Sequence, residues 1–446
     1  MGEKVFVAMS GGVDSSVAAL LLKKQGFDVV GVFMRCFSAR GGSAFGGNVD
    51  GCAERDAEDA RRVAEKLGIP FYVWDFEEEY KRRVVGYMVD GYRNGITPNP
   101  DVMCNKEIKF GLFLEKALKT GADYIATGHY VSFRPLSRTA VRSLQRLAPA
   151  ASRSDDASKT GDQAHRNSES PATVREGTER VQLARSRISP KLNLEPTSHI
   201  AYKRDQANLT SRFAFGDLRD FSKENFTQFG LYEARDKNKD QSYFLWTLTQ
   251  KQLNHCLFPI GSYLKLEVRE MARKAGLPTA DKKDSQGICF LGKVTLSDFL
   301  KRYIKEKRGA VLTTTGKKVG EHKGVYFYTI GQRHGLGIPA SRPYYIAEKD
   351  AKTNTIVVAE GENNPALYKK EIRLTSLNWI SGNAPELPAK VFARVRYRQP
   401  LSAATIVREG SGVRLVFKKP QKFVASGQSV VFYGKDGEML GGGIIL

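Results

Sequence analysis

The stretch that decides the fold is VAMSGGVDSSVAALLLKKQG, residues 7–26. A strand-like run over Lys4–Met9 ends in Ser-Gly-Gly, and a helix-like run over Ser15–Gln25 follows. A turn between a strand and a helix directs free backbone N–H groups to the positive end of the helix dipole. The two glycines let an anion approach the backbone, and three serine hydroxyls can donate to it. The stretch predicts a phosphate-binding turn; the alternative is an ordinary tight turn with Asp14 or Ser15 as the N-cap.

The turn is neither of the two commonest phosphate-binding motifs. It lacks the lysine of a Walker A loop, and it contains no G-x-G-x-x-G dinucleotide fingerprint. Strand–helix alternation continues through the first 133 residues, which predicts a parallel sheet covered on both faces, an α/β doubly wound domain. The further strands are expected over Phe27–Met34, Pro70–Asp75 and Asp123–Thr127, and the further helices over Ala53–Leu67 and Lys106–Lys119.

Composition points to a polyanionic partner. The 446 residues include 70 Lys and Arg against 48 Asp and Glu, a net charge of +22, which favours nucleic acid over a basic segment that only aids solubility. No apolar run reaches the roughly 20 residues of a membrane-spanning helix, and the N-terminal residues show no signal-peptide pattern. The five cysteines form no C-x-x-C pair, so neither a zinc site nor a disulfide framework is predicted. We therefore expect a cytoplasmic protein without a membrane partner and without a protein-held metal.

The chain divides into four parts by composition and pattern. No aromatic residue occurs from Arg134 to Ala201, a composition that cannot bury enough apolar surface to offset the entropy of ordering. Helical patterns return over Lys265–Ala275 and Leu296–Lys305, and beyond about residue 310 short strands and glycine turns predict a small barrel or sandwich. The expected parts are an α/β domain over 1–134 and 231–295, a largely disordered low-complexity insertion over 135–230, a central domain over 296–368 and a β-rich domain over 369–446.

Two cysteines lie in polar turns. Cys104, in GITPNPDVMCNKEIKFG, is expected directly before the helix over Lys106–Lys119, where a helix N-terminus lowers a thiol pKa toward the reactive thiolate. Cys289, in DKKDSQGICFLG, lies between glycines, with Lys282 and Lys283 nearby to favour an anionic sulfur. For either cysteine alone, a small buried hydrophobic residue is the commoner explanation. Their surroundings favour reactivity.

The glycine turn resembles the PP-loop of the ATP pyrophosphatases. Seven segments occur in the order seen in the tRNA-specific 2-thiouridylases, the MnmA family, and the resemblance covers everything except the insertion: SGGVDSS, NPDVMCNKEIKFG, ATGHY, KDQSYFL, DSQGICFLG, YTIGQRHGLGI and RVRYRQP. The resemblance implies a PP-loop catalytic domain, a small central domain and a C-terminal β-barrel.

The resemblance also implies the chemistry. ATP, with Mg²⁺ placed with help from Asp14, adenylates the C2 oxygen of the wobble uridine in tRNA. A persulfide on Cys289, loaded by a persulfide-carrier protein or a cysteine desulfurase, supplies sulfur. Cys104 is the nucleophile that assists its release and leaves a Cys104–Cys289 disulfide, a form of thiol–disulfide exchange. Asp101 handles protons. The oligomeric state stays open, with a monomer expected.

The remaining roles are carried over position by position. The nucleotide-binding positions are Ala8, Met9, Ser10, Gly11, Gly12, Val13, Asp14, Ser15, Met34 and Gly128. The positions expected to hold the target base are Asn99, Pro100 and Asp101. The positions expected to contact tRNA are His129, Lys239, Asp240, Gln241, Arg396, Tyr397 and Gln428. From the residues alone, His129 is equally well a hydrogen-bonded histidine at a strand end, and Arg396 and Tyr397 suit a solvated sheet face.

Three other functions are compatible with a PP-loop. A ligase acting on a small molecule leaves the basic charge, the β-rich domain and both cysteines unexplained. A 4-thiouridine synthetase is closer, but the contexts of the two cysteines differ from it. A non-catalytic RNA-binding protein leaves the intact turn, Asp101, Cys104 and Cys289 without a purpose.

Overall fold

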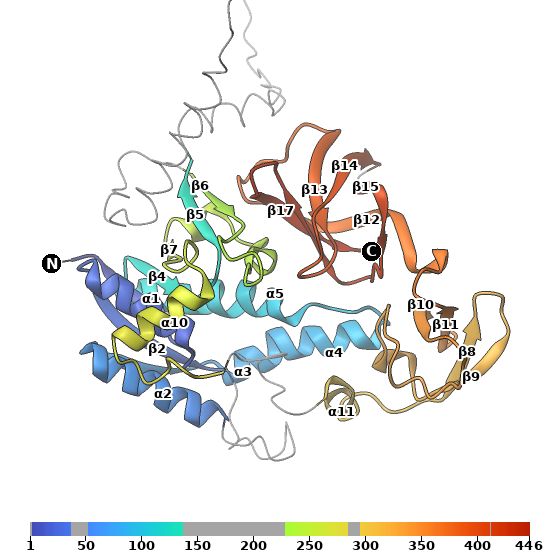
Figure 1. Ribbon diagram of the computed structural model, residues 1–446, viewed down its shortest axis with the longest axis horizontal. Helices are drawn as coiled ribbons and strands as arrows, with labels where there is room; N and C mark the ends of the chain where they lie inside the picture. The colour runs from blue at the N-terminus through green and yellow to red at the C-terminus, as the bar shows by residue number, and fades with distance from the viewer. Residues whose placement is uncertain (1, 37–51, 137–227, 284–294, 411) are drawn as a thin grey trace, which may run out of the picture. The chain divides into compact units, whose positions relative to one another are not determined.

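The computed structural model describes residues 2–36, 52–136, 228–283, 295–410 and 412–446 (Figure 1). Of the predicted insertion over 135–230, only residues 135–136 and 228–230 are among them. The predicted sulfur-bearing Cys289 lies outside the described residues, and so do Gly287 and Gly292.

A five-stranded parallel sheet forms the centre of the α/β domain, in the strand order β3-β2-β1-β4-β7. The central strand β1 pairs with β2, Val7 lying opposite Gly31, and with β4, Val7 lying opposite Ala126. Strand β1 has a paired strand on each side and helices on each face, which is why four of its five residues are buried and apolar. The strands are β1 Lys4–Ala8, β2 Asp28–Arg35, β3 Phe71–Asp75, β4 Tyr124–Thr127 and β7 Cys256–Leu257.

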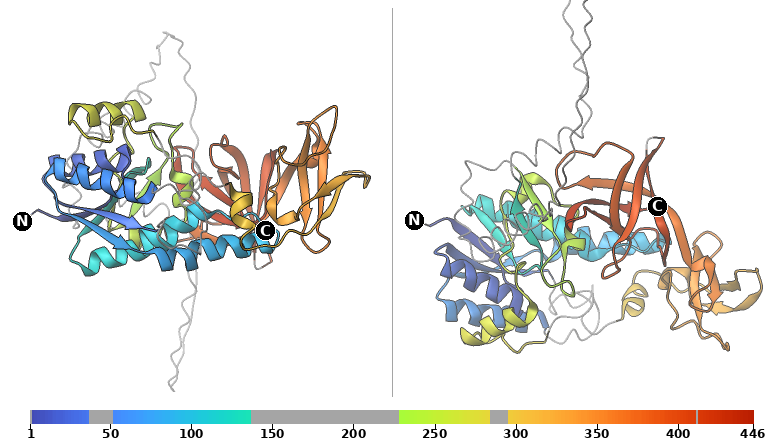
Figure 2. Two further views of the ribbon diagram at one scale, coloured as in Figure 1. Left: turned by 90° about the horizontal axis from the view of Figure 1, so that it is seen from below. Right: turned by 45° about the horizontal axis from the view of Figure 1, so that its top comes forward.

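Helices cover both faces of this sheet, as predicted (Figure 2). Alternate β1 side chains enter different cores: Val5 and Val7 pack with α1, α2 and α10, whereas Phe6 and Ala8 pack with the opposite layer. The first layer is α1 Val13–Lys24, α2 Cys52–Leu67 and α10 Lys265–Lys274. The second is α3 Glu77–Tyr80, the π-helical η1 Lys81–Val85, α4 Gly86–Arg93, α5 Pro100–Cys104, the π-helical η2 Asn105–Phe113 and α6 Leu114–Lys119. The doubly wound α/β fold is confirmed.

The helix that carries Cys104 begins earlier than predicted. It starts at Pro100, and α5, η2 and α6 follow one another without a break to Lys119. The Asn99 side chain caps it by accepting a hydrogen bond from the Val102 backbone N–H at 3.2 Å. An asparagine cap followed by proline is a strong helix start. The prediction that Cys104 directly precedes a helix N-terminus is therefore wrong: Cys104 is the last residue of α5, inside the helical segment.

Other helix expectations also differ. The helical stretch from Glu77 to Arg93 was not predicted. The helix expected over Leu296–Lys305 ends at Leu300, as α11 Leu296–Leu300, with the Thr295 side chain as its N-cap.

Two β structures follow. A four-stranded sheet in the order β10-β11-β8-β9 encloses its own small core around Val311, Ile346 and Ile356. A six-stranded antiparallel barrel closes where β17 pairs with β12, Ile445 opposite Leu374. The strands are β8 Gly309–Thr313, β9 Lys318–His322, β10 Tyr344–Asp350, β11 Thr355–Glu360, β12 Tyr368–Trp379, β13 Ala389–Arg394, β14 Ser402–Glu409, β15 Gly412–Lys422, β16 Ser429–Tyr433 and β17 Glu438–Ile445. The expected C-terminal β-barrel is confirmed.

The barrel sheet continues into the α/β domain. Strand β17 also pairs with β6 Phe229–Tyr232, which pairs with β5 Ser132–Pro135. Buried hydrogen bonds join the η4 turn, Ser242–Leu245, to the barrel: the Tyr243 hydroxyl donates to the Ser429 carbonyl at 2.8 Å. Within the described ranges, every helix is too short or too polar to cross a membrane.

Candidate active site

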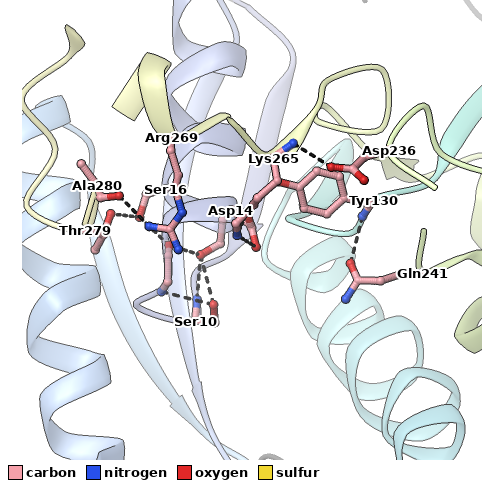
Figure 3. A network of polar contacts seen from close by, with 12 residues as sticks. Ser10, Asp14, Ser16, Tyr130, Asp236, Gln241, Lys265, Arg269, Thr279 and Ala280 are labelled. Carbon is pink, nitrogen blue, oxygen red and sulfur yellow. Dashed lines mark hydrogen bonds and ion pairs between the residues drawn. The ribbon is translucent and has the colours of Figure 1, made fainter. Parts of the chain in front are cut away.

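The glycine turn lies at the carboxyl end of β1 and opens α1 (Figure 3). The Ser10 backbone N–H donates to the Ser15 Oγ at 3.1 Å, and the Ser16 Oγ donates to the Gly12 carbonyl at 2.8 Å. These bonds hold the turn closed on itself. The first N–H groups of a helix have no partner within the helix, so the start of α1 offers donors of the kind that bind phosphate.

Glycine is required at two places around the turn. Gly11 has a φ of +71°, and a Cβ there would lie 2.2 Å from the Asp56 carbonyl oxygen on α2. Gly128 follows β4, and a Cβ there would lie 2.6 Å from the Ser15 backbone nitrogen. Backbone from β1, β4 and α2 therefore meets around the turn with no room for a side chain.

The predicted nucleotide-binding residues gather at one edge of the sheet. Met34 lies near the end of β2, residues 8–15 follow or end β1, and Gly128 follows β4. The chain adds β2 and β3 on one side of β1, and then β4 and β7 on the other side. Ligands of open α/β sheets bind at such a switch point. The geometry thus brings together the residues that the sequence predicted to hold a nucleotide.

A methyl group at Gly128 tests this site. We expect Gly128→Ala to weaken ATP binding at least about 10-fold, because the new Cβ displaces the first turn of α1 and even small misplacement of site groups is costly. Equilibrium dialysis with labelled ATP measures the change. Gly86→Ala, at a helical glycine whose Cβ would meet nothing closer than 3.7 Å, is the control. Equal affinity of both variants and the wild-type protein would contradict the assignment.

Asp14 forms an ion pair at the turn. Its two carboxylate oxygens lie 2.7 and 2.8 Å from the Lys265 Nζ, and the Tyr130 hydroxyl donates to the Oδ1 at 2.9 Å (Figure 3). Neither partner of Asp14 was predicted from the sequence. Lys265 lies 251 residues away, and no local pattern marks it; the only sequence signal is its place at the start of the helix predicted over Lys265–Ala275.

The residues present suit a nucleotide better than a metal held by protein. The turn offers backbone N–H groups, serine hydroxyls and glycine surfaces, the donor set that binds a polyphosphate. Among the described residues, no three His, Cys, Asp or Glu side chains cluster as a metal site. Asp14 is the single acidic side chain in the turn and faces Lys265.

The second part of the site is the start of α5. Burial raises the pKa of the Asp101 carboxyl above its ordinary range, and the nearby positive charge of Lys109 partly opposes that rise. Cys104, one turn along, is half-buried and packs against the core of the second helical layer. Asn99 is buried and holds the N-cap, and Pro100 is the first helical residue. A carboxyl with a raised pKa about one helical turn from a thiol is typical of a catalytic site.

His129 connects the two parts. It follows Gly128, is 7% exposed and lies with its Nδ1 2.8 Å from the Thr127 Oγ1. Its ring packs on Phe110 of the Cys104-bearing helix, with centroids 5.8 Å apart. Burial, aided by the charge of Lys109, lowers the pKa of His129 well below 6.5, so the ring is neutral at physiological pH.

Lys239, Asp240 and Gln241 differ in their burial and in their hydrogen bonds. Asp240 is 2% exposed, and its carboxylate accepts from the Ala234 and Ser242 backbone N–H groups. The Gln241 Oε1 accepts from the Tyr130 backbone N–H at 3.0 Å (Figure 3). These side chains hold the backbone together, whereas Lys239 is half-buried. Contact of this segment with tRNA stays a prediction.

Arg396 and Tyr397 do not lie on a sheet face: they follow β13 in a turn, are half-buried, and form the barrel's aromatic surface together with the exposed Arg398. The Tyr397 ring lies 4.5 Å from the Phe244 ring, and the Arg398 guanidinium lies over Tyr397 at 5.2 Å. The Arg396 guanidinium lies over Phe423 at 5.6 Å and donates to the Ile330 carbonyl at 2.6 Å. Rings with adjacent guanidinium groups suit stacking of unpaired bases.

Gln428 lies against the loop that precedes Asn99. Its Nε2 donates to the Thr97 carbonyl at 2.8 Å and the Pro98 carbonyl at 3.2 Å, and the Thr97 N–H donates to the Ser426 carbonyl at 2.8 Å. The barrel thus holds the backbone that leads into α5.

Comparisons with known proteins cover almost the whole chain. Three family models match: the tRNA methyl transferase HUP domain at residues 3–159 and 199–293, the tRNA methyl transferase PRC-barrel domain at 297–360 and the aminomethyltransferase beta-barrel domain at 369–445. A tRNA-specific 2-thiouridylase MnmA of Thiobacillus denitrificans is 38% identical over 100% of both chains. The tRNA-specific 2-thiouridylase MnmA 2 of Geobacillus kaustophilus is 38% identical over 99% of this chain and 94% of its own.

Among solved structures, a predicted subunit of tRNA methyltransferase from Methanocaldococcus jannaschii is 20% identical over 32% of this chain and 63% of its own. Its TM-score of 0.20 is too low to bear on the fold.

The fold and the site define a nucleotide-binding HUP-domain protein with a PRC-barrel and a C-terminal β-barrel. Within that class, the chain belongs to the tRNA-specific 2-thiouridylase (MnmA) family.

Proposed function

We propose that this protein is a tRNA 2-thiouridylase: it activates the wobble uridine of tRNA with ATP and replaces the C2 oxygen by sulfur. The observation that carries the proposal is a contact between the two parts of the site. The ring of His129, next to the nucleotide turn, packs on Phe110 with centroids 5.8 Å apart, and Phe110 belongs to the helical segment that begins at Pro100 and carries Asp101 and Cys104. The carboxyl and thiol are therefore close to the place where a nucleotide would bind, as a reaction that couples ATP to thiolation requires.

Activation needs a base and an anion cradle. The uracil O2 attacks the α-phosphorus, the bond from that phosphorus to the bridging oxygen breaks, and pyrophosphate leaves with the electron pair. The turn after β1 holds the phosphates. Asp101 accepts the N3 proton as O2 is adenylated, and it returns the proton once sulfur has replaced oxygen. Its raised pKa makes it a stronger base than an ordinary aspartate.

Sulfur transfer needs two thiols. In the proposal, the terminal sulfur of a Cys289 persulfide attacks C2 and AMP leaves. Cys104 then attacks the Cys289 sulfur, the S–S bond breaks, and its electron pair leaves the other sulfur on C2 as a thiocarbonyl. The Cys104–Cys289 disulfide that results is reduced by two electrons from a cellular dithiol. A persulfide-carrying protein or cysteine desulfurase reloads Cys289.

Gln428 is proposed to act on the reaction through the backbone of Thr97 and Pro98, which leads into Asn99, where the target base is proposed to bind. We expect Gln428→Ala to lower the thiolation kcat roughly 10-fold with little change in tRNA affinity, because the lost amide frees the Thr97 and Pro98 carbonyls that lead into Asn99. Single-turnover thiolation and filter binding measure the two quantities. Arg398→Ala, on the barrel's aromatic surface, should instead weaken tRNA binding. A Gln428 variant that loses only affinity would show that its side chain contacts tRNA directly.

The function is tested by incubating unmodified tRNA with the protein, Mg-ATP and a cysteine desulfurase with its cysteine substrate as the persulfide source, and by identifying the nucleoside formed. 2-Thiouridine with stoichiometric AMP is expected. 4-Thiouridine would indicate the alternative synthetase, and AMP formed only with a small amine or acid would indicate a ligase. Binding of tRNA without AMP would indicate an RNA-binding protein. A methylated base formed from S-adenosylmethionine would instead indicate a tRNA methyltransferase, the activity in the description of the HUP-domain family.

The surroundings that this chemistry needs are cytoplasmic. ATP, tRNA and reducing dithiols occur together there, and the protein's charge of +22 suits a polyanionic substrate. We propose that it acts as a monomer.

A further inference from the structure

The glycine turn has no cation of its own. Residues 8–16, AMSGGVDSS, contain neither lysine nor arginine, and Asp14 adds a negative charge at the mouth of α1. Backbone N–H groups and hydroxyls are neutral donors, so a triphosphate with several negative charges would face an uncompensated carboxylate. In Walker A loops a lysine within the loop meets this need. A cation must reach this turn from elsewhere in the fold.

Helix α10 brings one. Lys265 is its first residue, and its ammonium lies 2.7 and 2.8 Å from the Asp14 carboxylate oxygens. The residue is held at both ends: the Lys265 backbone N–H donates to the Asp236 Oδ2 at 3.0 Å, and the ammonium lies 5.8 Å from the Tyr130 ring centroid (Figure 3). Only 8% of the residue is exposed. The charge is thus fixed at the turn and desolvated, where it acts most strongly on a bound anion.

The neighbouring cation on the same face of α10 has a different task. Arg269, one turn further on, donates to the Ala280 carbonyl at 2.8 Å, and the Thr279 hydroxyl donates to the Ser16 Oγ at 3.0 Å. These contacts hold the 279–280 segment against α1. The side chain of Asp14 is a third exposed and that of Lys265 a tenth, so an incoming anion reaches the ion pair from the Asp14 side.

We propose that Lys265 is the polyphosphate-binding cation of this site. It pairs with Asp14 in the nucleotide-free protein and moves to the β- and γ-phosphates when ATP binds. When the bond to the α-phosphorus breaks, its ammonium offsets the charge that the departing pyrophosphate gains; Lys265 itself forms no covalent bond and transfers no proton. This assignment rests on the proposed function in requiring a nucleotide at the turn, but not on thiolation.

Binding of inorganic pyrophosphate to the full-length protein tests the assignment without turnover. We expect Lys265→Met to weaken pyrophosphate binding, measured by isothermal titration calorimetry, about 10-fold or more, because charge-assisted hydrogen bonds to phosphate are lost. AMP binding should change less than about twofold, since AMP lacks the phosphates concerned. Lys265→Arg should retain pyrophosphate binding. Lys274→Met removes the same charge from the exposed end of α10, where Lys274 pairs with Glu270, and should bind like the wild-type protein.

A second variant separates phosphate binding from simple neutralisation of Asp14. If Lys265 only cancels the carboxylate charge, the double variant Asp14→Asn/Lys265→Met regains wild-type pyrophosphate affinity, and the proposal is overturned. If Lys265 binds phosphate, the double variant stays weak compared with Asp14→Asn alone. The double variant also avoids a carboxylate left without its lysine partner, so it serves if Lys265→Met does not fold.

Thiolation assays on the same proteins distinguish the two failures. A wild-type protein that thiolates tRNA, with a Lys265→Met variant that binds pyrophosphate normally, would overturn this inference alone. A wild-type protein that binds pyrophosphate through Lys265 but makes no 2-thiouridine would overturn the proposed function and support the assignment of Lys265.

Discussion

Replacing Cys104 by serine is expected to reduce 2-thiouridine formation at least about 1,000-fold, because removal of a nucleophile from a catalytic unit costs several orders of magnitude. A serine hydroxyl cannot break the S–S bond in the proposed exchange, since the reaction requires a thiolate. The steps before sulfur release do not use the Cys104 sulfur. AMP and pyrophosphate should therefore still form once, and tRNA should remain bound to the protein with sulfur held on Cys289. Quantifying AMP and 2-thiouridine in a single turnover measures both effects.

Two other cysteines provide controls for Cys104→Ser. Cys36 is also half-buried and belongs to the same α/β domain, and Cys256 on β7 is 1% exposed, where burial strongly raises the pKa of its thiol. Neither has a role in the proposal, so Cys36→Ser should thiolate tRNA at close to the wild-type rate. Full activity of Cys104→Ser with a physiological persulfide donor would show that Cys104 is not the nucleophile. Loss of activity in Cys36→Ser to the same extent would show that the effect is general.

The fold was predictable because its signals are local. The apolar runs of β1 and β2 are buried on both faces, and Gly26 and Gly68 end helices in the left-handed conformation that glycine tolerates. The turn between β1 and α1 was found from consecutive residues for the same reason. The start of α5 is the exception: the Asn99–Pro100 cap is an equally local signal, yet two prolines so close together, Pro98 and Pro100, favour a turn over a helix when only the sequence is considered.

The rest of the site depends on contacts that no local pattern contains. Lys265 reaches Asp14 across 251 positions, and Gln428 reaches Thr97 across 331. Asp240 was assigned from resemblance to the tRNA surface, but its carboxylate accepts hydrogen bonds from Ala234 and Ser242 in the interior. In each case burial and tertiary pairing decide the task of the side chain, and those follow only from the folded chain.

Replacing Asp101 by asparagine is expected to lower thiolation at least about 100-fold, the usual cost of losing a general base. The same change should stabilise the protein at neutral pH. Because burial raises the pKa of Asp101, the folded state holds its proton more tightly than the unfolded state does. The free energy of unfolding therefore falls as the pH rises through the interval between the ordinary and the raised pKa, and it stays lower above it. Asparagine is neutral throughout and removes that penalty.

Urea unfolding of the two proteins from roughly pH 4 to roughly pH 8 measures the difference, which should grow with pH in favour of Asp101→Asn. Asp90→Asn, at an exposed aspartate of α4 that pairs with Arg93, is the control and should show no such trend. The activity profile has a matching signature. Lys109 lowers the pKa of Asp101, so Lys109→Met should raise it further and move the acidic limb of kcat/KM to higher pH. An asparagine variant that is inactive but no more stable at high pH would mean that Asp101 is not a buried base, because the desolvation that makes it basic is the same desolvation that costs stability.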